Sequence, residues 1–197
     1  MHLDKIVSSY ILNYREPARD EAKYFENQPS LRAAIRQATL TWLMPSGKKH
    51  PHQWRISRTL LEEGEQRLQA ASKRLKRAAD FAALHQLVES ELGHIHGIAE
   101  LTVYDIAHRL GAFLRKNPAH VYLHRGTKRG AAAFGLKGFT IRPEDLPAAF
   151  SKLTAAEIED CLCIYKDAFR EKVQKRRTRS TRGCASVRLR GCSGLFR

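Results

Sequence analysis

Residues 93–105 read GHIHGIAELTVYD, in which a short turn, HGIA at 96–99, separates two stretches of helical periodicity. The first helix is expected to end near Leu92, and the second to begin at Thr102. Two interpretations of the turn remain open. Gly97 either serves only to reverse the chain between packed helices, or it lets the backbone approach a phosphate, to which the first amides of the second helix donate hydrogen bonds.

The apolar pattern on both sides of this turn predicts an all-α fold. Helices are expected from residue 3 to Pro17, from Pro17 onward, from Pro29-Ser30 to Met44, over 56–75, over 81–92 with Asp80 as N-cap, over 102–114, from Pro118 to Gly130 or Gly135, and from Thr154 with Glu157 completing a capping box. Residues 136–153 are expected to form a loop, and no segment shows the alternation typical of a strand.

Length and composition predict one folded domain with an appended tail. The chain has 197 residues, of which 43% are hydrophobic, which is enough for a single core. The domain is expected over 1–171. Residues 172–197 are expected to form a flexible tail, because they contain nine Lys and Arg residues and no acidic residue.

The net charge of +15 is the strongest global feature of the sequence. Such a charge predicts a polyanionic partner, most often nucleic acid. Because the tail carries +9, the remaining domain carries only +6. The alternative for the tail is a solvated charged segment without a partner.

Neither a membrane nor a metal is expected as a partner. The sequence has no run of 18 apolar residues, and Asp4 lies too early for a signal peptide, so a cytoplasmic location is predicted. The four cysteines, Cys161, Cys163, Cys184 and Cys192, lack the spacing of a zinc or iron–sulfur site. No small-molecule cofactor is expected.

Four segments follow one another between residues 92 and 135: the hairpin HGIAELT, the helix VYDIAHRLGAF, the segment VYLHR and the pair Phe134-Gly135. Their order and spacing resemble the core of the helix-hairpin-helix DNA glycosylases, the superfamily of endonuclease III and the adenine-mismatch glycosylase. The chain also resembles a group of small uncharacterised bacterial proteins over most of residues 30–166. The resemblance implies a glycosylase-like helical bundle that binds double-stranded DNA, with hairpin contacts from Gly97, Ile98, Ala99 and Thr102.

Two departures from the family pattern bear on catalysis. Family members that also cut the strand carry a lysine where this chain has Leu101, so the resemblance implies a glycosylase without lyase activity. The family's catalytic aspartate corresponds to Tyr122, which cannot supply a negative charge. Asp105 is the candidate replacement, with His124 as an acid or an orienting group, and Tyr122 itself is kept as the third candidate catalytic residue. Alternatively, Asp105 is a surface residue favoured by the helix dipole, and His124 has no catalytic role.

The segment HPHQW at 50–54 resembles the part of the family in which a glutamine fills the gap left by an extruded base. His52, Gln53 and Trp54 are therefore candidates for a base-flipping wedge or pocket, since extruding a base costs a few kcal/mol that such contacts offset. The alternative is that Trp54 belongs to the core and that the histidines are solvated loop residues.

A basic cluster follows the VYLH segment. Arg125, Lys128 and Arg129 suit contacts to DNA phosphates. A solvated helix face is the alternative.

These features predict a DNA glycosylase that binds duplex DNA, flips a damaged or modified base and hydrolyses its N-glycosidic bond, in repair or in defence against phage DNA. A non-catalytic helix-hairpin-helix module that binds DNA is the main alternative. An RNA-binding protein is a third possibility, because a basic tail does not distinguish between the two sugars.

Overall fold

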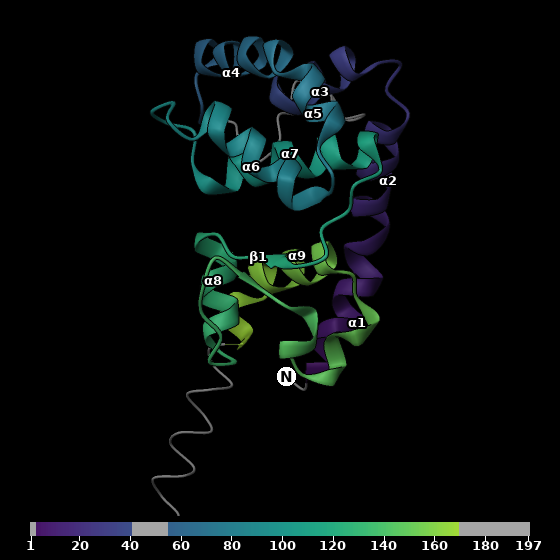
Figure 1. The fold of residues 1–197 in the computed structure, drawn as a ribbon. Coiled ribbons are helices and arrows are strands. Elements are labelled where there is room, and N and C mark those ends of the chain that lie inside the picture. Colours follow the sequence, from purple (N-terminus) through teal and green to yellow (C-terminus); the bar gives the residue numbers. More distant parts are fainter. Residues whose placement is uncertain (1–2, 41–54, 170–197) are drawn as a thin grey trace, which may run out of the picture.

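The computed structural model describes residues 3–40 and 55–169, and it is mostly helical, as the apolar pattern predicts (Figure 1). The helices are α1 (Leu3–Asn13), α2 (Arg15–Glu26), α3 (Leu31–Leu40), α4 (Arg58–Ala70), α5 (Ser72–Arg77), α6 (Phe81–Leu92), α7 (Glu100–Leu114), α8 (Arg125–Ala132) and α9 (Ala155–Ile164). Two short strands, β1 (Val121–Tyr122) and β2 (Thr140–Ile141), pair antiparallel, and 3-10 turns span Pro143–Asp145 and Ala148–Lys152. Within the described ranges, no helix combines the length and the apolarity that crossing a membrane requires.

Side-chain caps fix several helix starts where the sequence predicts them. The carboxylate of Asp80 accepts a hydrogen bond from the Ala83 amide at 2.8 Å, which confirms the start of α6. At α9, the Thr154 hydroxyl accepts from the Glu157 amide and the Glu157 carboxylate accepts from the Thr154 amide, so the predicted capping box is confirmed.

Two predicted helices are wrong in extent. The helix expected over 56–75 is broken at Ala71, where the backbone has φ −81° and ψ 0°, into α4 and α5. The helix expected from Pro118 begins only at Arg125, because residues 121–123 are extended and pair with β2. The region 136–153, expected as a loop, contributes β2 and both 3-10 turns.

The buried side chains form two clusters, one above the other in Figure 1. The upper lobe contains α3 to α7, and the lower lobe contains α1, β1, α8, β2 and α9. The β1 segment lies between them: Val121 and Leu123 pack into the lower cluster, and Tyr122 packs into the upper one. Because all three side chains are buried on alternating sides, an extended backbone suits this segment and a helix does not.

Helix α2 runs along the side of both lobes (Figure 1). At its start, Arg15 donates to both carboxylate oxygens of Glu157 on α9, at 2.8 and 3.0 Å. Six residues later, Glu21 accepts from the buried Arg109 of α7 at 3.0 Å, and Arg109 also donates to the Ala38 carbonyl of α3. Two charge-assisted contacts therefore tie α2 to one helix of each lobe.

We predict that Glu21→Gln lowers the free energy of unfolding by about 2 kcal/mol, because the guanidinium of Arg109 is 3% exposed and loses a charged acceptor. Urea denaturation measures this change. The matched control is Glu16→Gln on the same helix, since Glu16 is exposed and forms only a 3.4 Å contact with Arg19; a change of less than about 0.5 kcal/mol is expected there. Equal effects of the two substitutions would contradict the prediction.

Candidate functional site

The turn between α6 and α7 has a local reason for its glycine. Gly97 adopts φ +101°, a conformation that favours glycine, and a Cβ at this position would lie 3.2 Å from Leu60 Cδ1. The side chains of Ile95 and Ile98 are buried in the upper lobe, and the Ile98 amide donates to the Ile95 carbonyl at 3.0 Å. Backbone geometry alone thus accounts for Gly97, and both interpretations of the turn remain open.

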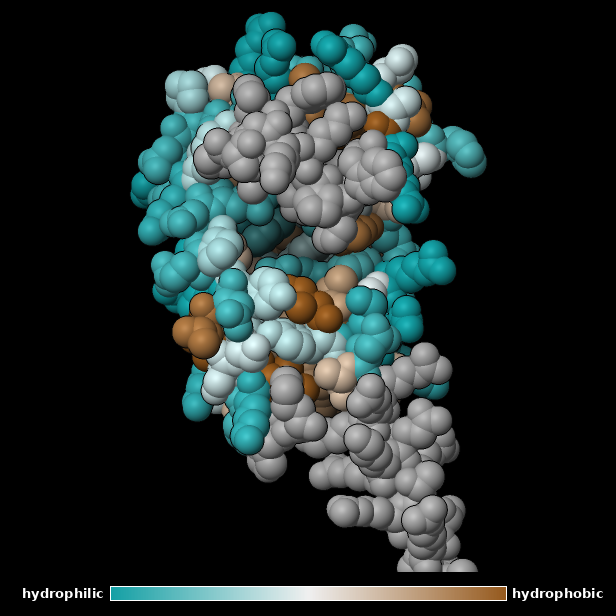
Figure 2. Space-filling model, turned by 180° about the vertical axis from the view of Figure 1, so that it is seen from behind, coloured by the Kyte–Doolittle hydropathy of each residue, from teal (hydrophilic) through white to brown (hydrophobic). Residues whose placement is uncertain are grey.

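A cavity of about 470 Å³ lies at the junction of the two lobes, between α2, α7 and α9. Each helix contributes one face to it, and on α7 the lining positions recur at the three- and four-residue spacing of a helix. Its charged and polar lining includes Glu21, Asp105, His108, Arg109, Glu159 and Asp160, with Arg109 paired to Glu21. In Figure 2, which views the molecule from behind, the surface is hollowed between the lobes. An acidic cavity therefore exists within a strongly basic chain.

His124 and Glu159 form a buried contact that joins the start of α8 to α9. The Nε2 atom of His124 contacts Oε1 of Glu159, and the two side chains are 4% and 7% exposed. The Gly126 amide donates to Nδ1 of the same imidazole at 3.3 Å, so Nδ1 is the acceptor. The proton of a neutral imidazole then lies on Nε2 and is donated to Glu159. His124 thereby positions the carboxylate that lines the cavity.

Asp160 follows Glu159 on the same helix and differs from it in environment. Burial, and then the neighbouring charge of Glu159, raise the pKa of Asp160 to about 7. Its Oδ2 accepts a hydrogen bond from the Tyr10 hydroxyl at 3.2 Å. The cavity thus holds a carboxyl group that exchanges its proton near neutral pH.

Tyr104 separates this cavity from a much smaller pocket on the other face of the junction, and it lines both. The pKa of Tyr104 lies well above its usual value because of burial and the nearby carboxylates of Glu159 and Asp160. Its hydroxyl is buried and has no hydrogen-bond partner among the described residues. Its ring stacks on that of His108 at a centroid distance of 5.8 Å. Tyr104 therefore stays a neutral phenol with an unused donor.

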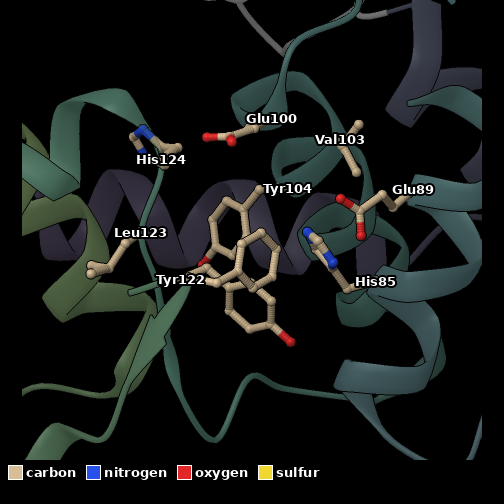
Figure 3. A pocket seen from close by; sticks show the side chains of 9 residues that line it. His85, Glu89, Glu100, Val103, Tyr104, Tyr122, Leu123 and His124 are labelled. Carbon is tan, nitrogen blue, oxygen red and sulfur yellow. The ribbon is translucent and has the colours of Figure 1, made fainter. Parts of the chain in front are cut away.

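The small pocket is aromatic (Figure 3). Tyr122 packs against His85 with ring centroids 4.6 Å apart and against Phe139 at 5.9 Å, and burial lowers the pKa of His85. Figure 3 shows Tyr104 and Tyr122 between His124 on one side and His85 on the other.

The three candidate catalytic residues are therefore divided between two sites. Asp105 lines the large cavity, whereas Tyr122 and His124 line the small pocket. His124 nevertheless reaches the cavity indirectly, through its contact with Glu159.

The basic candidates for DNA binding, Arg125, Lys128 and Arg129, lie on α8. Lys128 of α8 contacts Glu100 at the start of α7 at 2.9 Å, which brings the beginnings of the two helices together. Arg129 contacts Asp167 at 3.2 Å, and Arg125 is exposed. Exposed ion pairs of this kind contribute about 0–1 kcal/mol to stability. The Lys and Arg side chains can therefore leave these carboxylates and bind another anion.

The remaining candidate residues differ in their exposure to solvent. Ala99 is exposed and directly precedes α7, whereas Thr102 is buried within it. His52, Gln53 and Trp54 lie outside the described residues.

Sequence reasoning missed Glu159, Asp160 and His108 as site residues. One signal was available: Glu159, Asp160 and Cys163 recur at helical spacing on a face that otherwise carries Ala156 and Ile164. Acidic residues on a partly apolar helix face favour carboxyl groups with perturbed pKa values, which are candidates for a site. Burial raises the pKa of the Cys163 thiol to about 11, so this cysteine is a thiol at neutral pH.

Comparison with known proteins does not identify the chain. No protein family, no curated protein and no solved structure matches it. Within the described part of the chain, no group of three or more His, Cys, Asp and Glu side chains is arranged to hold a metal ion.

We predict that Asp160→Asn raises the free energy of unfolding at pH 8 relative to the wild type by roughly 2 kcal/mol. The carboxyl keeps its proton up to about pH 7 in the folded state but loses it near pH 3.8 when unfolded, so its contribution to stability falls as the pH rises through that window. Each unit of pKa shift corresponds to about 1.4 kcal/mol of stability. The expected change is smaller than the whole shift would give, because the Asp160 carboxyl is partly exposed and solvent screens its charge.

Denaturation of both proteins between pH 4 and pH 8 measures this difference. The exposed Asp167, which contacts Arg129, supplies the control: Asp167→Asn should leave the wild-type pH profile unchanged. A gap between Asp160→Asn and the wild type that does not widen with pH would contradict the assignment.

Proposed function

We propose that this chain is a DNA N-glycosylase that binds duplex DNA along the edge formed by the starts of α7 and α8 and hydrolyses the glycosidic bond of an extruded base in the interlobe cavity. The observation that carries this proposal is the set of carboxyl groups, with different environments, around one cavity of about 470 Å³. That volume lies within the range typical of small-ligand sites, about 300–1,000 Å³.

Cleavage of an N-glycosidic bond develops positive charge on the sugar. A carboxylate beside the sugar stabilises that charge, and Asp105 on the cavity face of α7 is suited to this role. The departing base gains negative charge and needs a proton. Asp160, with a pKa of about 7, is suited to donate it. The two carboxyl groups would then have different roles, one as a charged group and one as a proton donor, because their environments differ.

Charge complementarity supports the same assignment. Phosphates are repelled by an acidic cavity and attracted by the exposed cations outside it, such as Arg125 and Lys128. The backbone would therefore lie along the basic edge, and only a base with its sugar would enter the cavity.

The alternative function is a DNA-binding module without catalytic activity. It is favoured by one observation: Tyr122, at the position of the family's aspartate, lines the small aromatic pocket and not the acidic cavity. Tight binding to every duplex without release of a base would support this alternative.

The test of catalysis is incubation with duplexes that carry different modified bases, followed by heat and alkali to cut at abasic sites. We predict that Asp105→Asn lowers the rate of base release by about 10²–10³, because a transition-state charge loses its partner, while DNA affinity is retained. Asp20→Asn, at an exposed position of α2, is the control and should keep the wild-type rate. Near-normal turnover of Asp105→Asn would exclude the proposed role of Asp105.

The test of DNA binding is the salt dependence of the affinity. We predict that Arg125→Gln weakens binding to any duplex and reduces the slope of log K against log salt concentration by about 1, as loss of one phosphate contact does. Arg19→Gln serves as the control, since Arg19 is an exposed cation on α2. Deletion of residues 172–197 should flatten the slope further. Slopes that remain equal in all variants would exclude both elements from the interface.

A further inference from the structure

The helices α3, α4 and α5 carry most of the excess positive charge of the domain. They contain eight Lys and Arg residues and three Glu residues, which gives a net charge of +5, whereas residues 1–171 together carry +6. All three helices belong to the upper lobe, and α8, with the basic candidates for DNA binding, belongs to the lower lobe (Figure 1). A charge concentrated in this way attracts anions to one part of the surface.

The charges of α4 and α5 are arranged differently. On α4, Arg58 contacts Glu62 at 2.7 Å and Arg67 contacts Glu63 at 2.8 Å, so each of these cations has an acidic residue one turn away. The sequence of α5, SKRLKR, has no acidic residue and places cations three and four residues apart. Like charges at this spacing destabilise a helix. Helix stability alone therefore gives no reason for the charge pattern of α5.

The cations of α5 face the solvent because the apolar side chain of this helix faces the core. Leu75 is fully buried in the upper lobe, and so are Ala71 and Ala78, which flank the helix. The remaining residues of α5 are Ser72, which is half-buried, and four exposed cations, Lys73, Arg74, Lys76 and Arg77.

Three of these four cations are not neutralised by the protein. Arg74 contacts Glu91 of α6. Lys73, Lys76 and Arg77 form no ion pair within residues 3–40 and 55–169. These three side chains can therefore bind an external anion without breaking a contact of the fold.

Helix α3 extends the same basic surface. The side-chain amide of Gln69, at the end of α4 and three residues before α5, donates to the Arg32 carbonyl of α3 at 2.9 Å. Arg32 and Arg36 lie one turn apart, are exposed, and likewise have no ion pair in the described part of the chain. The α3–α5 basic face is defined by five residues, Arg32, Arg36, Lys73, Lys76 and Arg77.

This face has no apolar anchor. The large apolar side chains that are exposed in the described ranges are Leu12, Tyr14, Phe139 and Ile164, and none of them lies on α3, α4 or α5. Binding to a membrane surface or to another protein relies on such side chains beside the charges. A nucleic-acid backbone does not need them, because its affinity for cations comes from the release of condensed counterions.

We propose that the α3–α5 basic face binds the phosphate backbone of duplex DNA, as a second contact surface besides the edge formed by the starts of α7 and α8. The inference rests on the proposed function only for the identity of the ligand. It requires neither the interlobe cavity nor the release of a base. Because phosphates are the ligand, binding at this face does not depend on the base sequence.

The test removes the three cations of α5 together, as Lys73→Gln, Lys76→Gln and Arg77→Gln. The affinity of the full chain for a short unmodified duplex is measured by fluorescence anisotropy at several NaCl concentrations. We expect the slope of log K against log salt concentration to fall by about 2–3, since each lost phosphate contact lowers it by about 0.9. An unchanged slope would overturn the proposal.

The matched control removes the same charge from the lower lobe. Lys5→Gln, Lys137→Gln and Lys152→Gln, introduced together at exposed positions, should change the slope by less than about 1. Equal falls in the two triple variants would show that only net charge matters and would overturn the proposal.

Two further variants separate binding from folding. Lys73→Arg with Lys76→Arg keeps both charges and should keep the wild-type slope, and a fall there would overturn the assignment. The melting temperature of the triple α5 variant should be unchanged or higher, because like-charge repulsion is removed. If it is lower, the three single substitutions replace the triple variant, each with an expected fall in slope of about 1.

The outcome is separable from that of the proposed function. A smaller slope in the α5 variant together with a wild-type slope in Arg125→Gln would support the α3–α5 basic face and exclude the edge at α7 and α8. The reverse result would overturn the present inference alone. Vesicles of phosphatidylcholine and phosphatidylserine test the other polyanion: binding to them that is tighter than binding to the duplex at equal salt, and that is lost in the α5 variant, would overturn the assignment to DNA.

Discussion

The buried guanidinium of Arg109 holds together three helices, of which α2 and α7 line the interlobe cavity. It extends from α7 to Glu21 of α2 and to the Ala38 carbonyl of α3, and it lies 5.6 Å from the centre of the Phe25 ring. A charge removed from water in this way is tolerated only when its donors are used, so the positions of all three helices are constrained at once. The second ion pair, between Arg15 and Glu157, attaches the start of α2 to the lower lobe. The width of the cavity is therefore set by α2, a helix with a single buried residue, Phe25, and not by direct packing of the two cores.

The two lobes also meet along the extended segment that follows α7. Val121 and Leu123 belong to one core and Tyr122 to the other, so a shift of one residue would place each side chain in the wrong cluster. The end of this segment is fixed by His124, which caps α8 and contacts Glu159 of α9. The same residue thus fixes the connection between the lobes and one wall of the cavity. A structural and a functional explanation of His124 do not compete, because positioning Glu159 requires that the start of α8 be fixed.

Much of the fold is predictable from the sequence wherever the determining interactions are local. Asp80 and the pair Thr154–Glu157 fix the starts of α6 and α9 through contacts within three residues, and these predictions are confirmed. The prediction from Pro118 fails because the burial of Val121 to Leu123 on two sides is a property of the assembled lobes. For the cavity, the sequence offers Asp105 as a candidate, and this residue lies on α7, which begins at Glu100, two residues before the predicted Thr102. The pKa of Asp160 is raised by burial in the assembled fold, and its hydrogen bond from Tyr10 joins residues 150 positions apart in the chain, which no spacing rule reveals.

The distribution of satisfied and unsatisfied polar groups distinguishes the cavity from the rest of the interior. Where the structure buries a charge, as at Arg109, the guanidinium donates to two acceptors, the Glu21 carboxylate and the Ala38 carbonyl. Around the cavity the pattern is reversed: Asp160 has a pKa raised to about 7, and the Tyr104 hydroxyl is buried without a partner among the described residues. Each of these arrangements lowers the stability of the folded chain, and an apolar side chain of similar size would avoid the cost. Stability alone therefore gives no reason for a carboxyl group with this pKa, whereas the proton donation that we propose for Asp160 would give one.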